Sequence, residues 1–189
     1  MILQTDKHDI PATKAQPNTP RTDRGPKGPD GQRLEPVASP GTDLNCHGFT
    51  FGGGEWTIGE GSVPTILEDN YRAVAKGKAR VCDVVVYKKD GVCDHSGLVV
   101  EVDGNGNPKT IRSKWGPTGD VFDHPPDVQP YGDSFTTYER DPATLDQATQ
   151  VELDDLRKDY DKIADKSSLD ARNAAAKLCQ KRNALRRKP

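Results

Sequence analysis

The fold of this chain is decided by residues 81–102, which read VCDVVVYKKDGVCDHSGLVVEV. Two runs rich in β-branched side chains, residues 81–87 and 95–102, flank a polar segment that contains Asp90-Gly91. Runs of this kind separated by Asp-Gly are typical of two antiparallel strands joined by a tight hairpin. The sequence therefore predicts an antiparallel sheet that contains this hairpin.

Further elements on both sides of the hairpin complete the predicted domain. The Gly- and Asn-rich segment 103–107 predicts a turn before a third strand at 110–113, and residues 134–140 predict a fourth strand. Upstream, Ser62 predicts the start of a helix. The apolar stripe of that helix comprises Val63, Ile66, Leu67, Tyr71 and Val74. A helix followed by a small antiparallel sheet predicts an α+β fold for residues 43–141.

Residues 1–42 differ from this domain in composition, because they hold seven of the fifteen prolines and almost no aliphatic clusters. Such a segment buries too little apolar surface to offset the entropy lost on ordering. We expect a disordered or extended arm whose removal leaves the melting transition unchanged. The alternative is that part of the arm wraps the domain or fills its cleft.

Residues 142–189 form a third region, rich in Ala, Leu and charged residues. Helical spacing of the apolar residues on either side of Ser167-Ser168 predicts two helices. We expect a charged C-terminal helical extension that packs one face on the domain. A docking helix for a partner protein is the alternative interpretation.

Composition limits the partners and the location of the protein. A net charge of −2 gives no reason to expect nucleic acid as the main partner. The chain has no run of eighteen or more apolar residues, so we expect no membrane span. Residues 1–7 contain no apolar signal segment. We therefore expect a protein that stays in the cytoplasm or is exported by a route other than the Sec pathway.

The four cysteines do not suggest a disulfide framework. In simple hairpin register Cys82 lies opposite a residue near Leu98, well away from Cys93, and Cys179 belongs to a distant helical segment. Four unpaired thiols favour a reducing compartment.

Two short strings about fifty residues apart carry the candidate chemistry: Asn45-Cys46-His47-Gly48 and Asp94-His95-Ser96-Gly97. A thiol nucleophile needs a nearby imidazole, because the thiolate attacks and the imidazole takes the proton. Cys46 and His95 are therefore the candidate nucleophile and general base. The alternative is a buried cysteine and a hydrogen-bonded histidine with structural roles only.

These strings, together with Cys82-Asp83 and the strand that follows, resemble the NlpC and CHAP branches of the papain-like superfamily. The resemblance covers about residues 43–140 and rests on the order and spacing of the three motifs. It implies a papain-like fold with an N-terminal nucleophile helix that begins at Cys46 and a strand that carries the base His95. Cys82 stands where the family usually has glycine.

The resemblance also implies roles for individual residues. Cys46 matches the nucleophile and His95 the general base, without a metal or other cofactor. The family orients the imidazole with a polar residue on the next strand, and Ser113 is our candidate for this position. Trp115 and His124 lie in Pro-containing segments that could form a wall of the cleft, with His124 facing solvent.

The implied activity is hydrolysis of an amide bond in peptidoglycan, as an endopeptidase or an amidase. Such an enzyme would be a phage lysin or a delivered antibacterial effector, with a peptide or peptidoglycan substrate and an immunity or delivery protein as partner. Two alternatives use the same fold: a catalytically inactive binding module, and an acyltransferase or deamidase with the same Cys-His dyad.

A zinc site is a further alternative, with Cys46, His47, Cys93 and His95 as ligands. Zinc ligands in one pair are usually separated by two to four residues so that both side chains converge on the metal. Cys46 and His47 are adjacent in the chain and converge poorly, so the sequence favours the dyad.

Overall fold

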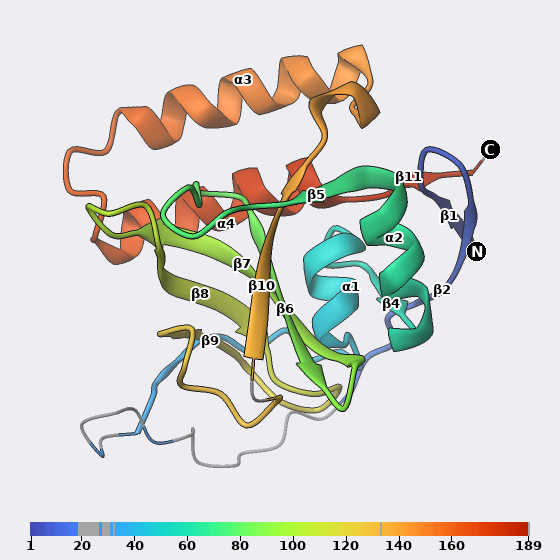
Figure 1. Ribbon diagram of the computed structural model, residues 1–189, viewed down its shortest axis with the longest axis horizontal. Helices are drawn as coiled ribbons and strands as arrows, with labels where there is room; N and C mark the ends of the chain where they lie inside the picture. Colours follow the sequence, from blue (N-terminus) through green and yellow to red (C-terminus); the bar gives the residue numbers. More distant parts are fainter. Residues whose placement is uncertain (19–26, 28–30, 32, 133, 189) are drawn as a thin grey trace.

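The structure is a computed structural model that describes all residues except 19–26, 28–30, 32, 133 and 189. It has an α+β fold with two antiparallel sheets and four α-helices in the described part of the chain (Figure 1). The larger sheet has the order β3 (Pro36–Ala38), β9 (Val121–His124), β8 (Pro108–Lys114), β7 (Val92–Val102), β6 (Val84–Lys89), β10 (Ser134–Arg140), β5 (Tyr71–Ala73). The predicted hairpin is confirmed as β6 and β7, at the centre of this sheet.

The apolar runs in β6 and β7 are continuous because both faces of the sheet are buried there. Val84, Val86, Leu98 and Val100 point to one face and belong to the main core. Their neighbours Val85, Tyr87 and Val99, with Ile111 of β8, form a second small cluster on the other face. Alternate side chains of one strand therefore fill two separate apolar layers.

The smaller sheet joins the two ends of the chain. Its order is β11 (Arg186–Arg187), β1 (Ile2–Gln4), β2 (Asp9–Lys14), β4 (Trp56–Ile58). Leu3 and Ile10 are almost fully buried in the main core. Residues 1–14 thus form extended strands that pack on the domain, as in the alternative in which part of the arm wraps it, with strand pairing on both sides of β1. The rest of the predicted arm, residues 15–42, includes residues 19–26, 28–30 and 32, which lie outside the described part of the chain.

The four α-helices are α1 (Cys46–Phe51), α2 (Val63–Asn70), α3 (Gln147–Asp161) and α4 (Leu169–Asn183), with short 3-10 turns η1 (Glu60–Ser62) and η2 (Pro142–Thr144). The predicted helix after Ser62 is confirmed, but it ends at Asn70 rather than continuing to Val74. Tyr71 begins β5 and pairs with Arg140 of β10. Its apolar side chain faces the core from a strand, which a helical stripe in the sequence could not reveal.

The C-terminal helices differ in how they pack. α4 buries Ala171, Ala175, Ala176, Leu178 and Cys179 in or against the main core. The buried guanidinium of Arg140 donates 2.9 Å hydrogen bonds to the carbonyl oxygens of Arg182 and Ala184 and so fixes the end of α4. α3 has no buried residue and lies along α4 (Figure 1). The predicted extension is therefore two helices, of which α4 is part of the domain core.

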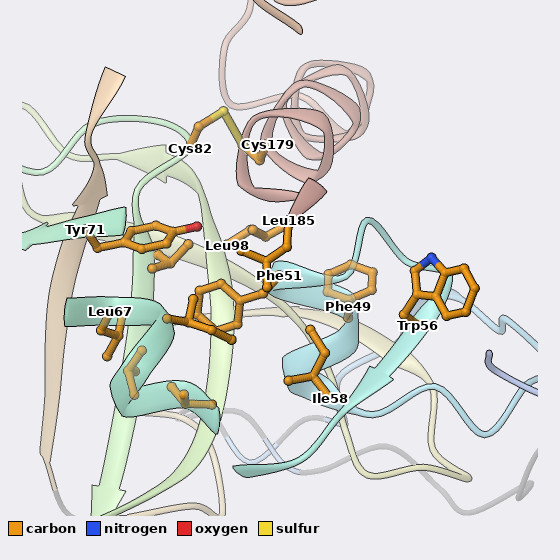
Figure 2. Packing of buried hydrophobic residues seen from close by; sticks show 14 of the residues in the cluster. Phe49, Phe51, Trp56, Ile58, Leu67, Tyr71, Cys82, Leu98, Cys179 and Leu185 are labelled. Carbon is orange, nitrogen blue, oxygen red and sulfur yellow. A yellow bond between two sulfur atoms is a disulfide. The ribbon is translucent and has the colours of Figure 1, made fainter. Parts of the chain in front are cut away.

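A disulfide joins Cys82, just before β6, to Cys179 of α4 (Figure 2). The expectation of four unpaired thiols is therefore wrong, and the free cysteines are Cys46 and Cys93. The two half-cystines are 97 residues apart in the chain, with Cα atoms 4.5 Å apart. Hairpin register could not reveal this pairing, because it depends on how α4 packs on the sheet. No helix among the described residues is long and apolar enough to cross a membrane.

Candidate active site

Cys46 is the first residue of α1, as the resemblance implied, and its neighbours explain why the helix begins there. The side chain of Asn45 caps the helix, accepting a 2.8 Å hydrogen bond from the N–H of Gly48. The same side chain donates a 2.7 Å bond to the carbonyl oxygen of Ile58 in β4. A Cβ atom on Gly48 would lie 1.9 Å from the carbonyl oxygen of Trp56, so only glycine fits there. The string Asn45-Cys46-His47-Gly48 thus encodes a capped helix start packed against β4.

α1 is attached to β7 through the hydroxyl of Ser96. Ser96 Oγ lies 2.9 Å from Nδ1 of His47 and 3.0 Å from Oγ1 of Thr50, both on α1. His47 is buried, and the loss of solvation lowers its pKa to about 4. His47 is therefore a neutral structural contact between the helix and the sheet.

The Cys46 thiol lies at this junction and is 8% exposed. Burial raises its pKa to about 11, and the negative charge of Asp94 also acts to raise it. Hydrogen bonds from the backbone N–H groups of Ser96, His47 and Cys46 itself act in the opposite direction but do not offset the burial. The thiol is therefore protonated at neutral pH.

His95 precedes Ser96 on β7, and alternation along the strand points its side chain away from α1. The imidazole is fully buried and stacks on Tyr131, with ring centroids 4.1 Å apart and an interplanar angle of 16°. Tyr87 of β6 is the second aromatic neighbour, at 5.6 Å. Burial lowers the pKa of His95 well below 6.5, and the nearby His124 and His47 lower it further. His95 is therefore neutral.

Both ring nitrogens of His95 lack a hydrogen-bond partner among the described residues. The structure thus brings Cys46 against the strand that carries His95, but no hydrogen bond joins the thiol to the imidazole. The imidazole points away from α1, so the structure does not bring the Cys46 thiol and the His95 ring together as a hydrogen-bonded dyad. An orphaned imidazole is costly in a folded protein and calls for a physical explanation.

Ser113 does not have the role predicted for it. Its hydroxyl lies 2.8 Å from Nε2 of His124 and accepts a 3.0 Å bond from the indole N–H of Trp115. The other ring nitrogen of His124 is 2.8 Å from the carbonyl oxygen of Pro125, which makes Nε2 the acceptor for the Ser113 hydroxyl. The expected hydrogen bond from His95 to Ser113 is therefore absent, and His124 is buried rather than facing solvent.

This network could not be found from the sequence because strand β9 was not predicted. β9 pairs with β8 and places His124 opposite Ile111, on the same face as Ser113. Gly97, the residue after Ser96, is required by its close contact with β8. A Cβ atom on Gly97 would lie 2.6 Å from Ile111 and 2.9 Å from Ser113. Gly97 thus allows β7 and β8 to approach closely beside the candidate site.

Lys114 is a second residue that sequence analysis missed. Its buried ammonium group donates hydrogen bonds to the carbonyl oxygens of Gly116 (2.8 Å), Pro117 (3.1 Å) and Gly119 (2.6 Å). These bonds hold the turn after β8, which includes Trp115. The alternation of polar and apolar residues in residues 110–116 predicts a strand. It does not predict that the lysine side chain is buried and binds backbone carbonyl oxygens.

The described residues include no group of three or more His, Cys, Asp or Glu side chains placed to hold a metal ion. A large surface hollow of about 670 Å³ lies elsewhere, beside the Gly52-Gly53 turn at the opposite end of α1 from Cys46. Its other walls come mainly from α4 and β11. The hollow therefore does not belong to the candidate dyad.

Comparison with known proteins gives no matching family model, no matching curated protein and no matching solved structure. The resemblance to the NlpC and CHAP branches thus stays an expectation from the order and spacing of the motifs.

Proposed function

We propose that this protein is a thiol-dependent amide hydrolase of the papain-like class, with Cys46 as nucleophile and His95 as general base. The observation that carries the proposal is the buried imidazole of His95 with two unpartnered nitrogens. It is adjacent in the chain to Ser96, whose hydroxyl donates a 3.4 Å hydrogen bond to the carbonyl oxygen of Cys46. A buried polar group without a partner costs about 1–3 kcal/mol, and functional sites are where such costs are usually found.

The order of the elements supports this proposal. A cysteine begins a helix, the helix packs on an antiparallel sheet, and a histidine lies on the strand against which the helix packs. This is the arrangement that the resemblance to papain-like amide hydrolases implies. In this chain the hydrogen bonds of His47 and Thr50 to Ser96 attach the helix to that strand.

The resting site is a neutral pair rather than a thiolate and an imidazolium. The thiol pKa of about 11 and an imidazole pKa well below 6.5 both disfavour the ion pair in the free protein. Because the His95 side chain points away from α1, catalysis requires the imidazole to turn toward the Cys46 thiol when substrate binds, after which His95 acts as a general base.

In the acylation step the Cys46 sulfur attacks the amide carbon while its proton passes to His95. His95 returns that proton to the departing amine as the C–N bond breaks, which leaves a thioester. Water then attacks the thioester, His95 takes a proton from the water, and the thiol leaves with that proton as the acid product forms. The backbone N–H groups of Cys46, His47 and Ser96 are the donors available to the oxyanion.

We infer that the substrate is an amide bond of peptidoglycan, cleaved by an endopeptidase or amidase reaction, as the resemblance implies. The Cys82–Cys179 disulfide supports a site of action outside a reducing cytoplasm. That destination suits a phage lysin or a delivered antibacterial effector with an immunity or delivery partner.

A specific observation favours a second candidate, an inactive binding module with the same fold. A thiol that is 8% exposed with a pKa of about 11 is not an activated nucleophile in the free protein. Iodoacetamide should then label Cys46 slowly at neutral pH. A hydrolase predicts that peptidoglycan fragments change this rate in a His95-dependent manner, and a module predicts no dependence on His95.

The direct test incubates purified peptidoglycan sacculi with the protein and measures released fragments by mass spectrometry. We expect release by the wild type, loss of release in Cys46→Ser and His95→Gln, and normal release in Cys93→Ser. Cys93 is the matched control because it is the other free, buried cysteine and lies on the same strand as His95. Full release by Cys46→Ser would refute the hydrolase, and binding of sacculi without any release would identify the module.

A further inference from the structure

The orientation of His95 has no hydrogen-bonding explanation. In enzymes with a thiol and an imidazole, a third group that accepts from the second ring nitrogen usually holds the base. Here neither ring nitrogen of His95 has a partner among the described residues, and Ser113 is occupied by His124 and Trp115. Some other contact must fix the plane of this buried ring.

The closest ring contact of His95 is Tyr131, in the segment between β9 and β10. The rings are nearly parallel, at 16°, with centroids 4.1 Å apart. The contact with Tyr87 is longer, at 5.6 Å, and inclined by 35°. Stacked aromatic rings favour one relative plane, so the Tyr131 contact restricts rotation of the imidazole.

Tyr131 can restrict another ring because it is itself fixed. The edge of Trp115 contacts it, with centroids 5.8 Å apart and an interplanar angle of 74°. The backbone N–H of Tyr131 donates to the side-chain oxygen of Gln129. The hydroxyl of Tyr87 donates a 2.8 Å bond to the carbonyl oxygen of Pro126, which ties the segment to β6.

The backbone after Tyr131 is also constrained. Gly132 has a φ of +65°, and a Cβ atom there would lie 2.5 Å from the carbonyl oxygen of Lys88 in β6. Glycine is thus required both by the backbone conformation and by the close approach to the sheet. The contacts of Trp115 with the ring and of Gln129 and Gly132 with the backbone thus fix the position of Tyr131 over His95.

We propose that Tyr131 is a positioning residue that orients the imidazole of His95 by stacking, in place of a hydrogen-bond acceptor. The inference rests on the proposed function of His95. It assigns the effect to the ring of Tyr131 and not to its hydroxyl, for which no hydrogen bond is found among the described residues. Burial raises the pKa of Tyr131 to about 12, so the phenol also stays neutral in the working range.

The test compares Tyr131→Phe, which keeps the ring, with Tyr131→Leu, which removes it. Phe135→Leu is the matched control, because Phe135 contacts Tyr87 at 5.7 Å but has no recorded contact with His95. With peptidoglycan fragments as substrate, Tyr131→Phe and Phe135→Leu should keep kcat. Tyr131→Leu should lower kcat by roughly two- to ten-fold with KM unchanged, the rate equivalent of one aromatic contact.

A second readout does not depend on turnover. Nuclear magnetic resonance of the ring nitrogens should show one tautomer of His95 in the wild type and in Tyr131→Phe, with no titration between pH 5 and 8. In Tyr131→Leu both tautomers should appear, and the titration should move upward as water reaches the ring. If Tyr131→Leu does not fold, Tyr131→Met replaces the ring with a flexible side chain and serves the same comparison.

The outcomes separate this inference from the hydrolase proposal. Unchanged His95 signals in the ring-deleted variants would overturn the positioning role, and so would a higher kcat, which would make Tyr131 a cover instead. Altered His95 signals without hydrolysis by any variant would uphold the positioning role and reject the hydrolase.

Discussion

The half-cystine Cys82 combines an unfavourable backbone conformation with a long-range covalent bond, and the two contributions can be measured separately. Its φ is +77°, a region in which a side chain costs about 1–2 kcal/mol relative to glycine. The disulfide closes a loop of 97 residues, for which the chain-entropy relation gives about 4.7 kcal/mol of stabilisation. We therefore expect Cys179→Ala to lower the free energy of unfolding by about 4–5 kcal/mol.

In the Cys179→Ala background no disulfide forms, so the effect of the positive φ at position 82 on the free energy of unfolding can be measured by itself. Cys82→Gly should be more stable than Cys82→Ala by about 1 kcal/mol, although glycine normally weakens a folded chain. Cys93 is the control, since it is buried in β7 and does not have a positive φ, and there the glycine variant should be less stable than the alanine variant. Urea denaturation monitored by circular dichroism gives these differences. Equal stability of the two position-82 variants, or an advantage for alanine, would refute the reasoning.

Three further expectations follow from burial and charge. Deletion of residues 1–14 should destabilise the protein by about 3–6 kcal/mol, measured by denaturation, because Leu3, Ile10 and the smaller Ala12 leave the core. Burial raises the pKa of Asp83 from 3.8 to about 6, so stability should fall as pH rises between these values. Asp83→Asn should remove this slope, and a slope that persists would exclude the assignment. Ser113→Ala should cost about 1–3 kcal/mol of stability, because His124 and Trp115 lose their shared partner. If instead turnover fell with no change in unfolding, Ser113 would have a role in the reaction.

The parts of the fold that the sequence predicted depend on short-range physics. The hairpin of β6 and β7 is encoded by two β-branched runs and by a turn in which Asp90 and Gly91 both have positive φ. The start of α1 at Cys46, which the resemblance implied, is stabilised by the capping side chain of Asn45. These signals lie within a few residues of the structure they specify, so one sequence is enough to read them.

The parts that were missed depend on partners far along the chain. A strand of three residues such as β1 is too short to show a period, and its stability comes from Leu3 and from pairing with residues 186–187. The Ser113–His124 bond requires the unpredicted strand β9, and the disulfide requires the packing of α4. The positions of Cys46 at the start of a helix and of His95 on a strand were therefore predicted, while the contacts around His95 were not.

The pairing of β1 with β11 affects when the protein can complete its fold during synthesis. β1 is made well before β11 during synthesis, so Leu3 acquires its neighbour Arg187 only after the segments between them have been made. Contacts of such high sequence separation slow folding and delay cooperativity, because a large loop must close before they contribute. Leu3 and Ile10 face each other across β1 and β2, and the pairing of β1 with β11 is added only after residues 186–187 have been made. Any thiol chemistry that needs the completed core is thus postponed until translation of this region has ended.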